Sequence, residues 1–189
     1  MSGNNEKLVF KGQTEAIYKI IVIGDPHVGK TSLLTKFSTE KFSTQYIPTV
    51  GVNIVKEQLE TVVNNENILV NLMLWDVAGQ PQFYMLHKPY FNGADGALLV
   101  FDITRSSTFS NVKNWWNTCI KHGLSSIPRA LVGNKIDLKD DRKIVQPHAD
   151  HLSEEINAAY FETSAKTGIN VKLIFEAIAQ KVYLSKSKK

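Results

Sequence analysis

The octet Gly24-Asp25-Pro26-His27-Val28-Gly29-Lys30-Thr31 interrupts an apolar run and decides how the surrounding chain folds. The residues before it, Tyr18-Lys19-Ile20-Ile21-Val22-Ile23, form a short run rich in β-branched side chains, which indicates a buried strand. The residues after it, Thr31 to Phe37, are typical of the first turns of a helix. The stretch from Ile17 to Leu34 therefore predicts a strand, a glycine-containing loop and a helix in direct succession.

This loop fits the pattern of a phosphate-binding loop, or P-loop. Phosphate binding needs backbone N–H groups that turn inward and the positive end of a following helix, without bulky side chains in the way. Lys30 would reach the β- and γ-phosphates, and the hydroxyl of Thr31 would bind Mg²⁺. Alternatively, Gly24 and Gly29 only mark a strand-to-helix turn and Lys30 is solvated. The order of the glycines, Lys30, Thr31 and the flanking elements favours phosphate binding.

Length and composition favour one globular domain in a reducing compartment. A chain of 189 residues with 43% hydrophobic and 21% charged residues can bury a single core. Its one cysteine, Cys119, cannot form an internal disulfide. No apolar run approaches the roughly 20 residues that span a bilayer, and no signal peptide precedes the first strand. We therefore expect a cytoplasmic protein, with peripheral contact to membranes at most.

The net charge of +4 does not indicate nucleic-acid binding, because the excess is confined to one end of the chain. Four of the 22 basic residues are in the C-terminal segment: Lys181, Lys186, Lys188 and Lys189. Without them, 18 basic residues balance 18 acidic ones. Nucleic-acid binders usually carry a basic face on the folded domain, so we expect no nucleic-acid partner.

Strand and helix patterns alternate along the rest of the chain. We expect further strands at 50–61, 68–75, 97–103, 130–133 and 160–163, and helices at 106–122, 148–159 and 171–182. The turn 64–67 would join the first two of these strands as a hairpin. This order predicts an α/β fold of the P-loop NTPase type, a six-stranded mostly parallel sheet with one antiparallel strand and helices on both faces. We expect a flexible arm at 1–14, this domain at 15–183 and a basic tail at 184–189.

Acidic residues lie at or near the ends of two of the predicted strands. Asp76 begins the segment Asp76-Val77-Ala78-Gly79-Gln80, and by itself it could equally cap a helix. Beside a P-loop, however, a second acidic group is what Mg²⁺ near phosphates requires. Asp102 could cap the helix that follows it, and we expect Trp115 and Trp116 of that helix to lie in the core.

Five motifs, taken in this order, resemble the Ras superfamily of small GTPases and are most similar to its Rab branch. They are GDPHVGKT at 24–31, IPTVGV at 47–52, WDVAGQ at 75–80, NKID at 134–137 and TSAK at 163–166. The similarity covers about Ala16 to Tyr183. The Rab character rests on Gly51-Val52 after Thr49, on Trp75, and on Phe101-Asp102-Ile103-Thr104.

The resemblance implies that NKID and TSAK bind guanine. Asp137 would accept paired hydrogen bonds from guanine N1–H and the exocyclic amine, a donor pair that adenine lacks. Asn134 would tie this loop to the P-loop, and the stem of Lys135 would cover one face of the base. Ala165 would donate its backbone N–H to guanine O6, with Ser164 and Lys166 bracing that loop and Phe42 approaching the base edge-on. Taken singly, NKID could be a polar surface turn and TSAK a helix cap.

The same resemblance implies hydrolysis of GTP to GDP by water, with catalysis by positioning and charge neutralisation. Lys30 would hold phosphate charge and Gln80 would orient the attacking water. Thr49 and the backbone N–H of Gly79 would sense the γ-phosphate, so hydrolysis would release two loops. The expected Mg²⁺ set is Thr31, Thr49 and Asp76. The residues expected to contact the nucleotide are Gly24, His27, Val28, Gly29, Lys30, Thr31, Ser32, Phe42, Tyr46, Thr49, Gly79, Asn134, Lys135, Asp137, Ser164, Ala165 and Lys166.

Three departures from the family pattern lie near the expected γ-phosphate site. Pro26 and His27 stand where the family commonly has small residues, and Pro81 follows Gln80. Proline fixes φ, lacks an N–H and restricts the residue before it. We expect intrinsic hydrolysis to persist while crowding at Pro26 impairs stimulation by an activating protein.

The resemblance also implies a monomer that regulates membrane traffic or a related process through effectors, an exchange factor and an activating protein. The apolar segment 83–86 could join Ile47, Val50, Ile54 and Trp75 in a partner-binding surface of the GTP state, or these residues could pack as ordinary core. No cysteine for a lipid anchor occurs in 184–189. Either the natural chain has no anchor and makes weak, salt-sensitive contact with anionic membranes at most, or its anchor follows Lys189 in a longer chain.

Two other functions fit part of the sequence. A P-loop kinase or ATPase would share the octet 24–31 but would not explain NKID and TSAK. A GTP-binding interaction module that barely hydrolyses GTP would keep every binding motif. Comparing GTP with ATP binding separates the first alternative, and single-turnover hydrolysis separates the second.

Overall fold

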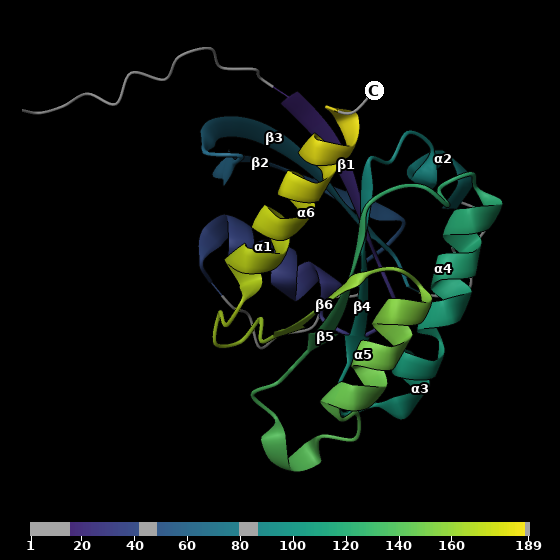
Figure 1. Cartoon of the computed structure of the whole chain (residues 1–189). Helices are drawn as coiled ribbons and strands as arrows, with labels where there is room; N and C mark the ends of the chain where they lie inside the picture. The colour runs from purple at the N-terminus through teal and green to yellow at the C-terminus, as the bar shows by residue number, and fades with distance from the viewer. Residues whose placement is uncertain (1–15, 42–48, 80–86, 188–189) are drawn as a thin grey trace, which may run out of the picture.

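A six-stranded sheet forms the centre of the computed structural model, which describes residues 16–41, 49–79 and 87–187 (Figure 1). The strand order is β2-β3-β1-β4-β5-β6. The strands are β1 (Ala16–Ile23), β2 (Val52–Val63), β3 (Glu66–Val77), β4 (Gly96–Asp102), β5 (Arg129–Asn134) and β6 (Ala159–Thr163). β2 pairs antiparallel with β3, and the other neighbouring pairs are parallel. This confirms the predicted α/β fold.

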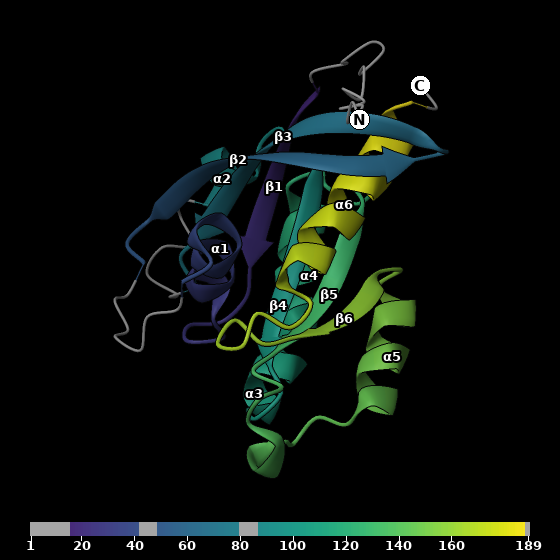
Figure 2. The ribbon, with the colours of Figure 1, turned by 90° about the vertical axis from the view of Figure 1, so that its left-hand side faces the viewer.

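Helices cover both faces of this sheet (Figure 1). One face carries α1 (Lys30–Thr39) and α6 (Val171–Lys186), which lie together in front of the sheet in Figure 2. The other face carries α2 (His87–Phe91), α3 (Ser106–Ser110), α4 (Val112–Lys121) and α5 (Gln146–Glu155), and the 3-10 turn η2 (Lys139–Asp141) precedes α5. Across the described ranges, no helix is long and apolar enough to cross a bilayer.

Alternating side chains on β1 divide the core into two layers. Ile20 and Val22 belong to the layer under α1 and α6, whereas Ile21 and Ile23 belong to the layer under α2 to α5. This is the side-chain period of a strand that is buried on both faces. In the second layer Trp115 and Trp116 are 3% and 7% exposed, which confirms their predicted place in the core. Beside Trp116, the Arg129 guanidinium lies 3.9 Å from the ring centre.

Two of the predicted helices have different bounds in the structure. The helix expected at 106–122 is divided at Asn111, whose side chain donates to Asp25 instead of remaining on the helix surface. The helix expected at 148–159 spans Gln146–Glu155, with Pro147 in its first turn, where proline is favoured. It ends early because Asn157 adopts a left-handed φ of 50° before the chain enters β6. The short helix α2 was not predicted.

Two smaller predictions about turns and caps are also wrong. The hairpin turn is tighter than 64–67, because Asn64 and Asn65 alone form it with positive φ, and Glu66 already pairs with Val63. Asp102 does not cap α3, since the residue before that helix is Arg105. Asp102 instead accepts hydrogen bonds from Thr104 and Arg105.

Candidate functional site

Two glycines allow the loop between β1 and α1 to lie directly against neighbouring elements. Gly24 and Gly29 have φ angles of 145° and 98°, which favour glycine. A Cβ at Gly24 would overlap the carbonyl of Val100 in β4, and one at Gly29 would overlap the side-chain amide of Asn134 at the end of β5. The loop is thus packed against the carboxyl ends of two parallel strands, the usual ligand-binding edge of an α/β sheet.

Lys30 is buried at the start of α1 and folds back over this loop. Its side chain is 6% exposed, and its Nζ donates to the carbonyls of Gly24 (2.7 Å) and Asp25 (2.9 Å). Burial lowers the pKa of Lys30 to about 8, although the charges of Asp76 and Asp25 oppose the shift. The amino group therefore rests on backbone oxygens, from which it can turn toward a phosphate.

Two hydroxyls and a carboxylate converge beside Lys30. Thr31 Oγ1 lies 2.5 Å from Asp76 Oδ2 and 2.9 Å from Thr49 Oγ1. Thr49 Oγ1 lies 3.3 Å from the same carboxylate oxygen. These side chains come from α1, the end of β3 and the residues before β2. The structure thus brings together three residues that are far apart in sequence.

The second carboxylate oxygen of Asp76 suggests what this cluster holds. Asp76 is completely buried, yet among the described residues its Oδ1 has no hydrogen-bond partner. Burial raises the pKa of Asp76, against the opposing effects of Thr31, Lys30 and Thr49. An unpaired buried oxygen is unfavourable, and a carboxylate with two hydroxyls matches the oxygen ligands that Mg²⁺ prefers. The residues present therefore fit a Mg²⁺ ion.

Gly79 brings the segment after β3 against the P-loop. A Cβ at Gly79 would lie only 2.8 Å from Pro26 N, so a larger residue would separate the two segments. The N–H of Ala78 donates to the carbonyl of Gly51 at 2.9 Å. The segment that carries Gly79 is therefore joined to the segment that carries Thr49.

Asn134 joins three loops through one buried side chain. Its Nδ2 donates to the carbonyl of Val28 at 2.9 Å. Its Oδ1 accepts from the hydroxyl of Thr163 and the N–H of Ala165, both at 3.2 Å. The N–H expected to bind guanine O6 is thus directed at Asn134 in this structure.

The other NKID and TSAK side chains have contacts that the sequence patterns do not specify. Ser164 Oγ donates to Asp137 Oδ1 at 2.6 Å, which fixes the carboxylate expected to bind guanine. Lys135 has a left-handed φ of 72°, and its Nζ lies 2.7 Å from Asp102 Oδ2. Lys166 is exposed.

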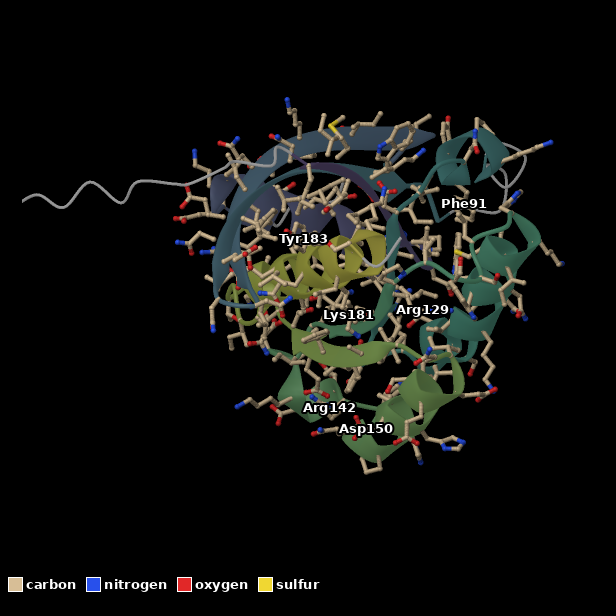
Figure 3. The ribbon with its side chains drawn as sticks, turned by 45° about the horizontal axis from the view of Figure 1, so that its top comes forward. Phe91, Arg129, Arg142, Asp150, Lys181 and Tyr183 are labelled. Carbon is tan, nitrogen blue, oxygen red and sulfur yellow. The ribbon has the colours of Figure 1, made fainter. Side chains whose placement is uncertain are left out.

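The TSAK loop is also braced from outside the site. Arg142 donates to both oxygens of Glu162 at 2.7 and 2.8 Å, and Tyr160 donates to Glu162 Oε1 at 2.9 Å. The Arg142 hydrogen bonds hold the pKa of Glu162 below its ordinary value, although burial opposes this. Arg142 lies on the side of the molecule that carries Asp150 of α5 (Figure 3). Sequence reasoning missed this brace, because Arg142 lies 20 residues before Glu162 in a different element and the three residues match no motif.

The remaining predicted site residues are divided between segments outside the described ranges and the start of α1 with the loop before it. Phe42, Tyr46 and Gln80 lie outside the described residues. Val28 is buried, Ser32 is half-buried in the first turn of α1, and His27 is exposed with a φ of 66°.

The proposed partner surface is only partly described. Val50 and Ile54 are 76% and 44% exposed, whereas Ile47 and 83–86 lie outside the described residues. Trp75 is half-buried, with Lys19 Nζ 3.6 Å from its ring centre.

Comparison with known proteins identifies one matching family and several relatives of similar sequence. The profile of the Ras family matches residues 19–184. Rab-13 of Mesocricetus auratus is 36% identical over 168 residues, which cover 89% of this chain and 81% of that protein. The GTP-binding protein yptV2 of Volvox carteri is 35% identical over 169 residues, with 89% and 76% covered. Rab-8B of Homo sapiens is 34% identical over 173 residues, with 92% and 82% covered.

Proposed function

Because the chain belongs to the Ras family of small GTPases, we propose that it is a molecular switch that binds GTP, hydrolyses it to GDP and phosphate, and regulates membrane traffic as a Rab-like protein. The observation that carries this proposal is the position of Asn134. Its side chain links the P-loop at Val28 to the TSAK loop at Ala165. A phosphate-binding loop and a guanine-binding pair of loops would therefore act as one nucleotide site.

The base side of this site would select guanine. Ser164 holds one oxygen of Asp137, and the carboxylate can still accept from guanine N1–H and the exocyclic amine. Adenine would leave this carboxylate without a donor pair, and sites built on such bonds discriminate by about 10⁴-fold or more. A P-loop kinase or ATPase would not require a carboxylate placed to accept from the guanine donor pair.

The phosphate side would bind and stabilise charge. Lys30 would exchange the carbonyls of Gly24 and Asp25 for phosphate oxygens, with little movement of a side chain that is already confined. Thr31, Thr49 and Asp76 would hold Mg²⁺, which when bound supplies positive charge beside the β- and γ-phosphates. Gln80 would orient the attacking water.

The switch would depend on the two segments that meet beside the P-loop. Thr49 and the N–H of Gly79 would respond to the γ-phosphate, and the Ala78 to Gly51 hydrogen bond couples their segments. Loss of the γ-phosphate would release both. The exposed Val50 and Ile54 would then belong to a surface by which effectors distinguish the GTP state from the GDP state. An exchange factor and an activating protein would also act on the chain.

Nucleotide binding and single-turnover hydrolysis by the purified chain test this proposal. We expect GTP and GDP to bind far more tightly than ATP, and Gln80→Leu to slow hydrolysis without loss of GTP binding. Gln146→Leu at the exposed start of α5 is a matched control and should leave the rate unchanged. If Gln80→Leu also leaves it unchanged, the chain is better described as a GTP-binding interaction module.

Pro26 gives a second test of the hydrolysis step. The proline ring is expected to crowd an arginine that an activating protein would insert beside Gln80. Pro26→Gly should therefore increase stimulation by cell extract while it changes intrinsic hydrolysis little. Equal stimulation of the parent and Pro26→Gly would contradict this part of the proposal.

A further inference from the structure

Arg105, just before α3, joins the P-loop to a buried carboxylate. Its Nη2 donates to the carbonyl of Pro26 at 2.9 Å, and its Nε donates to Asp102 Oδ2 at 3.0 Å. Asp102 is 1% exposed, whereas the Arg105 side chain is 37% exposed. The two bonds use two different nitrogens of one planar guanidinium, so they fix its orientation. Arg105 is therefore held in place by Asp102 and holds Pro26 in turn.

Asp25, the preceding residue of the P-loop, is held by residues of the same helical layer. Asp25 Oδ1 accepts from Trp115 Nε1 at 2.8 Å and from Asn111 Nδ2 at 2.5 Å. Asn111 lies between α3 and α4, and Trp115 lies in α4. Two successive residues of the loop are thus fastened to the helical layer that contains α3 and α4.

The bond to Pro26 acts on a backbone position that is otherwise unfavourable. His27 has a φ of 66°, in the left-handed region that residues other than glycine rarely adopt. Such conformations persist when surrounding contacts determine them. The Pro26–His27 peptide bond is trans, so the carbonyl of Pro26 and the N–H of His27 point in opposite directions across one plane.

We propose that Arg105 is a positioning residue: by holding the carbonyl of Pro26 toward α3, it turns the N–H of His27 toward the phosphates of the bound nucleotide. This inference rests on the proposed nucleotide-binding function and deepens it. Proline at 26 removes one backbone donor from the loop, which makes the direction of the next N–H more important. Arg105 thereby compensates for the two residues at which this P-loop departs from the family pattern.

Asp102 connects this arrangement to the base side of the site. Its Oδ2 lies 3.0 Å from Arg105 Nε and 2.7 Å from Lys135 Nζ of the NKID motif. Its Oδ1 accepts from the N–H and the hydroxyl of Thr104 at 2.9 and 2.7 Å. A buried carboxylate needs such partners, and removing one leaves part of its charge uncompensated, so the remaining partners must rearrange around it. Loss of Arg105 would therefore disturb the phosphate side first and the base side through Lys135.

The test is the rate at which a fluorescent GDP analogue leaves the full chain when excess unlabelled GTP is added. Arg105→Ala should increase this rate about tenfold, as expected for loss of a charge-assisted hydrogen bond. Arg105→Lys keeps the charge but cannot reach both acceptors in the same way, so its rate should be intermediate. Lys113→Ala is the matched control, because Lys113 on α4 pairs with Glu155 at 2.7 Å and does not touch the P-loop. Its rate should stay within about twofold of the parent.

A double-mutant cycle separates positioning from a general loss of stability. Glycine adopts left-handed φ angles freely, so His27→Gly removes the need for an external constraint. Arg105→Ala should then change the release rate clearly less in the His27→Gly background than in the parent. An arginine that merely stabilises the fold would give the same change in both backgrounds.

The possible failures are distinguishable. If the parent chain does not bind the GDP analogue, the proposed function is wrong and the role of Arg105 falls with it. If the parent binds but Arg105→Ala releases the analogue within about twofold of the parent rate, only the role of Arg105 is wrong. An equal effect of Arg105→Ala in both backgrounds also overturns it.

Discussion

The base side and the phosphate side of the candidate site differ in how completely their polar groups are paired. On the base side, the Asn134 side chain bonds to Val28 of the P-loop, to Thr163 at the end of β6 and to Ala165, and Ser164 holds Asp137. On the phosphate side, Asp76 Oδ1 lacks a partner among the described residues and His27 has a left-handed backbone. Within the described ranges, both polar atoms of the buried Asn134 side chain have partners on the base side, whereas the phosphate side has a buried acidic oxygen without a partner.

This difference indicates how the two sides would contribute to binding. Groups that are already fixed lose little entropy when a ligand arrives, so the base side suits selection between purines. An unpaired buried carboxylate oxygen favours a cation, so the phosphate side would gain most from nucleotide with Mg²⁺. A site divided in this way can retain GTP and GDP through the base while it responds to the γ-phosphate.

The largest expected effect on nucleotide affinity comes from a substitution on the base side. Asp137→Asn should weaken GTP binding by a factor on the order of 10⁴, because an amide group cannot accept from both guanine donors. The same variant should prefer xanthosine triphosphate, whose C2 carbonyl can accept from the new amide. Ser164 can still donate to the remaining oxygen, so folding should be retained. Competition binding measures both affinities, and unchanged GTP affinity would contradict the assignment.

A smaller effect on nucleotide binding is expected when the buried carboxylate on the phosphate side, Asp76, loses its charge. Asp76→Asn should lower the affinity for Mg²⁺ by about 10–100-fold, the usual consequence of altering a group that supports a metal. A titration of GDP release against Mg²⁺ concentration gives this affinity, and chelation should accelerate release less in the variant than in the parent. Asp140→Asn, at an exposed position in η2, is the control. If GDP release depends on Mg²⁺ concentration in the same way in the parent and in Asp76→Asn, Asp76 has no role in binding the metal.

The brace behind the TSAK loop should give a pH-dependent effect on stability. Arg142 lowers the pKa of Glu162, so this pair stabilises the fold above the range in which free glutamate protonates, about pH 4–5. That contribution is lost as the pH falls through the lowered pKa of the folded state. Glu162→Gln should reduce the free energy of unfolding at pH 7 by about 1–3 kcal/mol, and the difference should shrink in acid.

Urea unfolding of both proteins from neutral to acid pH measures this change. Glu155→Gln is the matched control, since its exposed pair with Lys113 should contribute about 0–1 kcal/mol. A difference for Glu162→Gln that does not vary with pH would show that its charge does not stabilise the fold.

The smallest expected effect concerns the hold of α4 on the P-loop. Trp115→Phe removes the N–H that donates to Asp25 and should accelerate GDP release about fivefold, while the preference for GTP over ATP stays unchanged. Trp116→Phe is the control, because Trp116 is also buried but lies against Arg129. Equal acceleration by both variants would point to lost packing in place of the lost hydrogen bond.

Local patterns in the sequence were sufficient for the strands, most helices and the motifs. The β-branched run before Gly24 predicts β1, and the order of strands and helices predicts the parallel sheet. Parallel strands present their carboxyl ends at one edge, so Asp76 and Asn134, which lie at strand ends, are both placed at the edge that carries the P-loop. No pattern in the sequence indicated that the predicted helix is divided at Asn111.

What the sequence by itself determined is therefore the set of elements, their order and the residue types at the strand ends. The tertiary structure alone decided which side chains hold those ends in place: Arg105 on Pro26, Trp115 on Asp25, and Arg142 on Glu162. The partners of the first two bonds are 79 and 90 residues apart. Hydrophobic periodicity reports only on neighbours within a few turns or strand residues, because it reflects the geometry of one element. A hydrogen bond between distant residues depends on how the elements pack, and it becomes visible only when they are assembled.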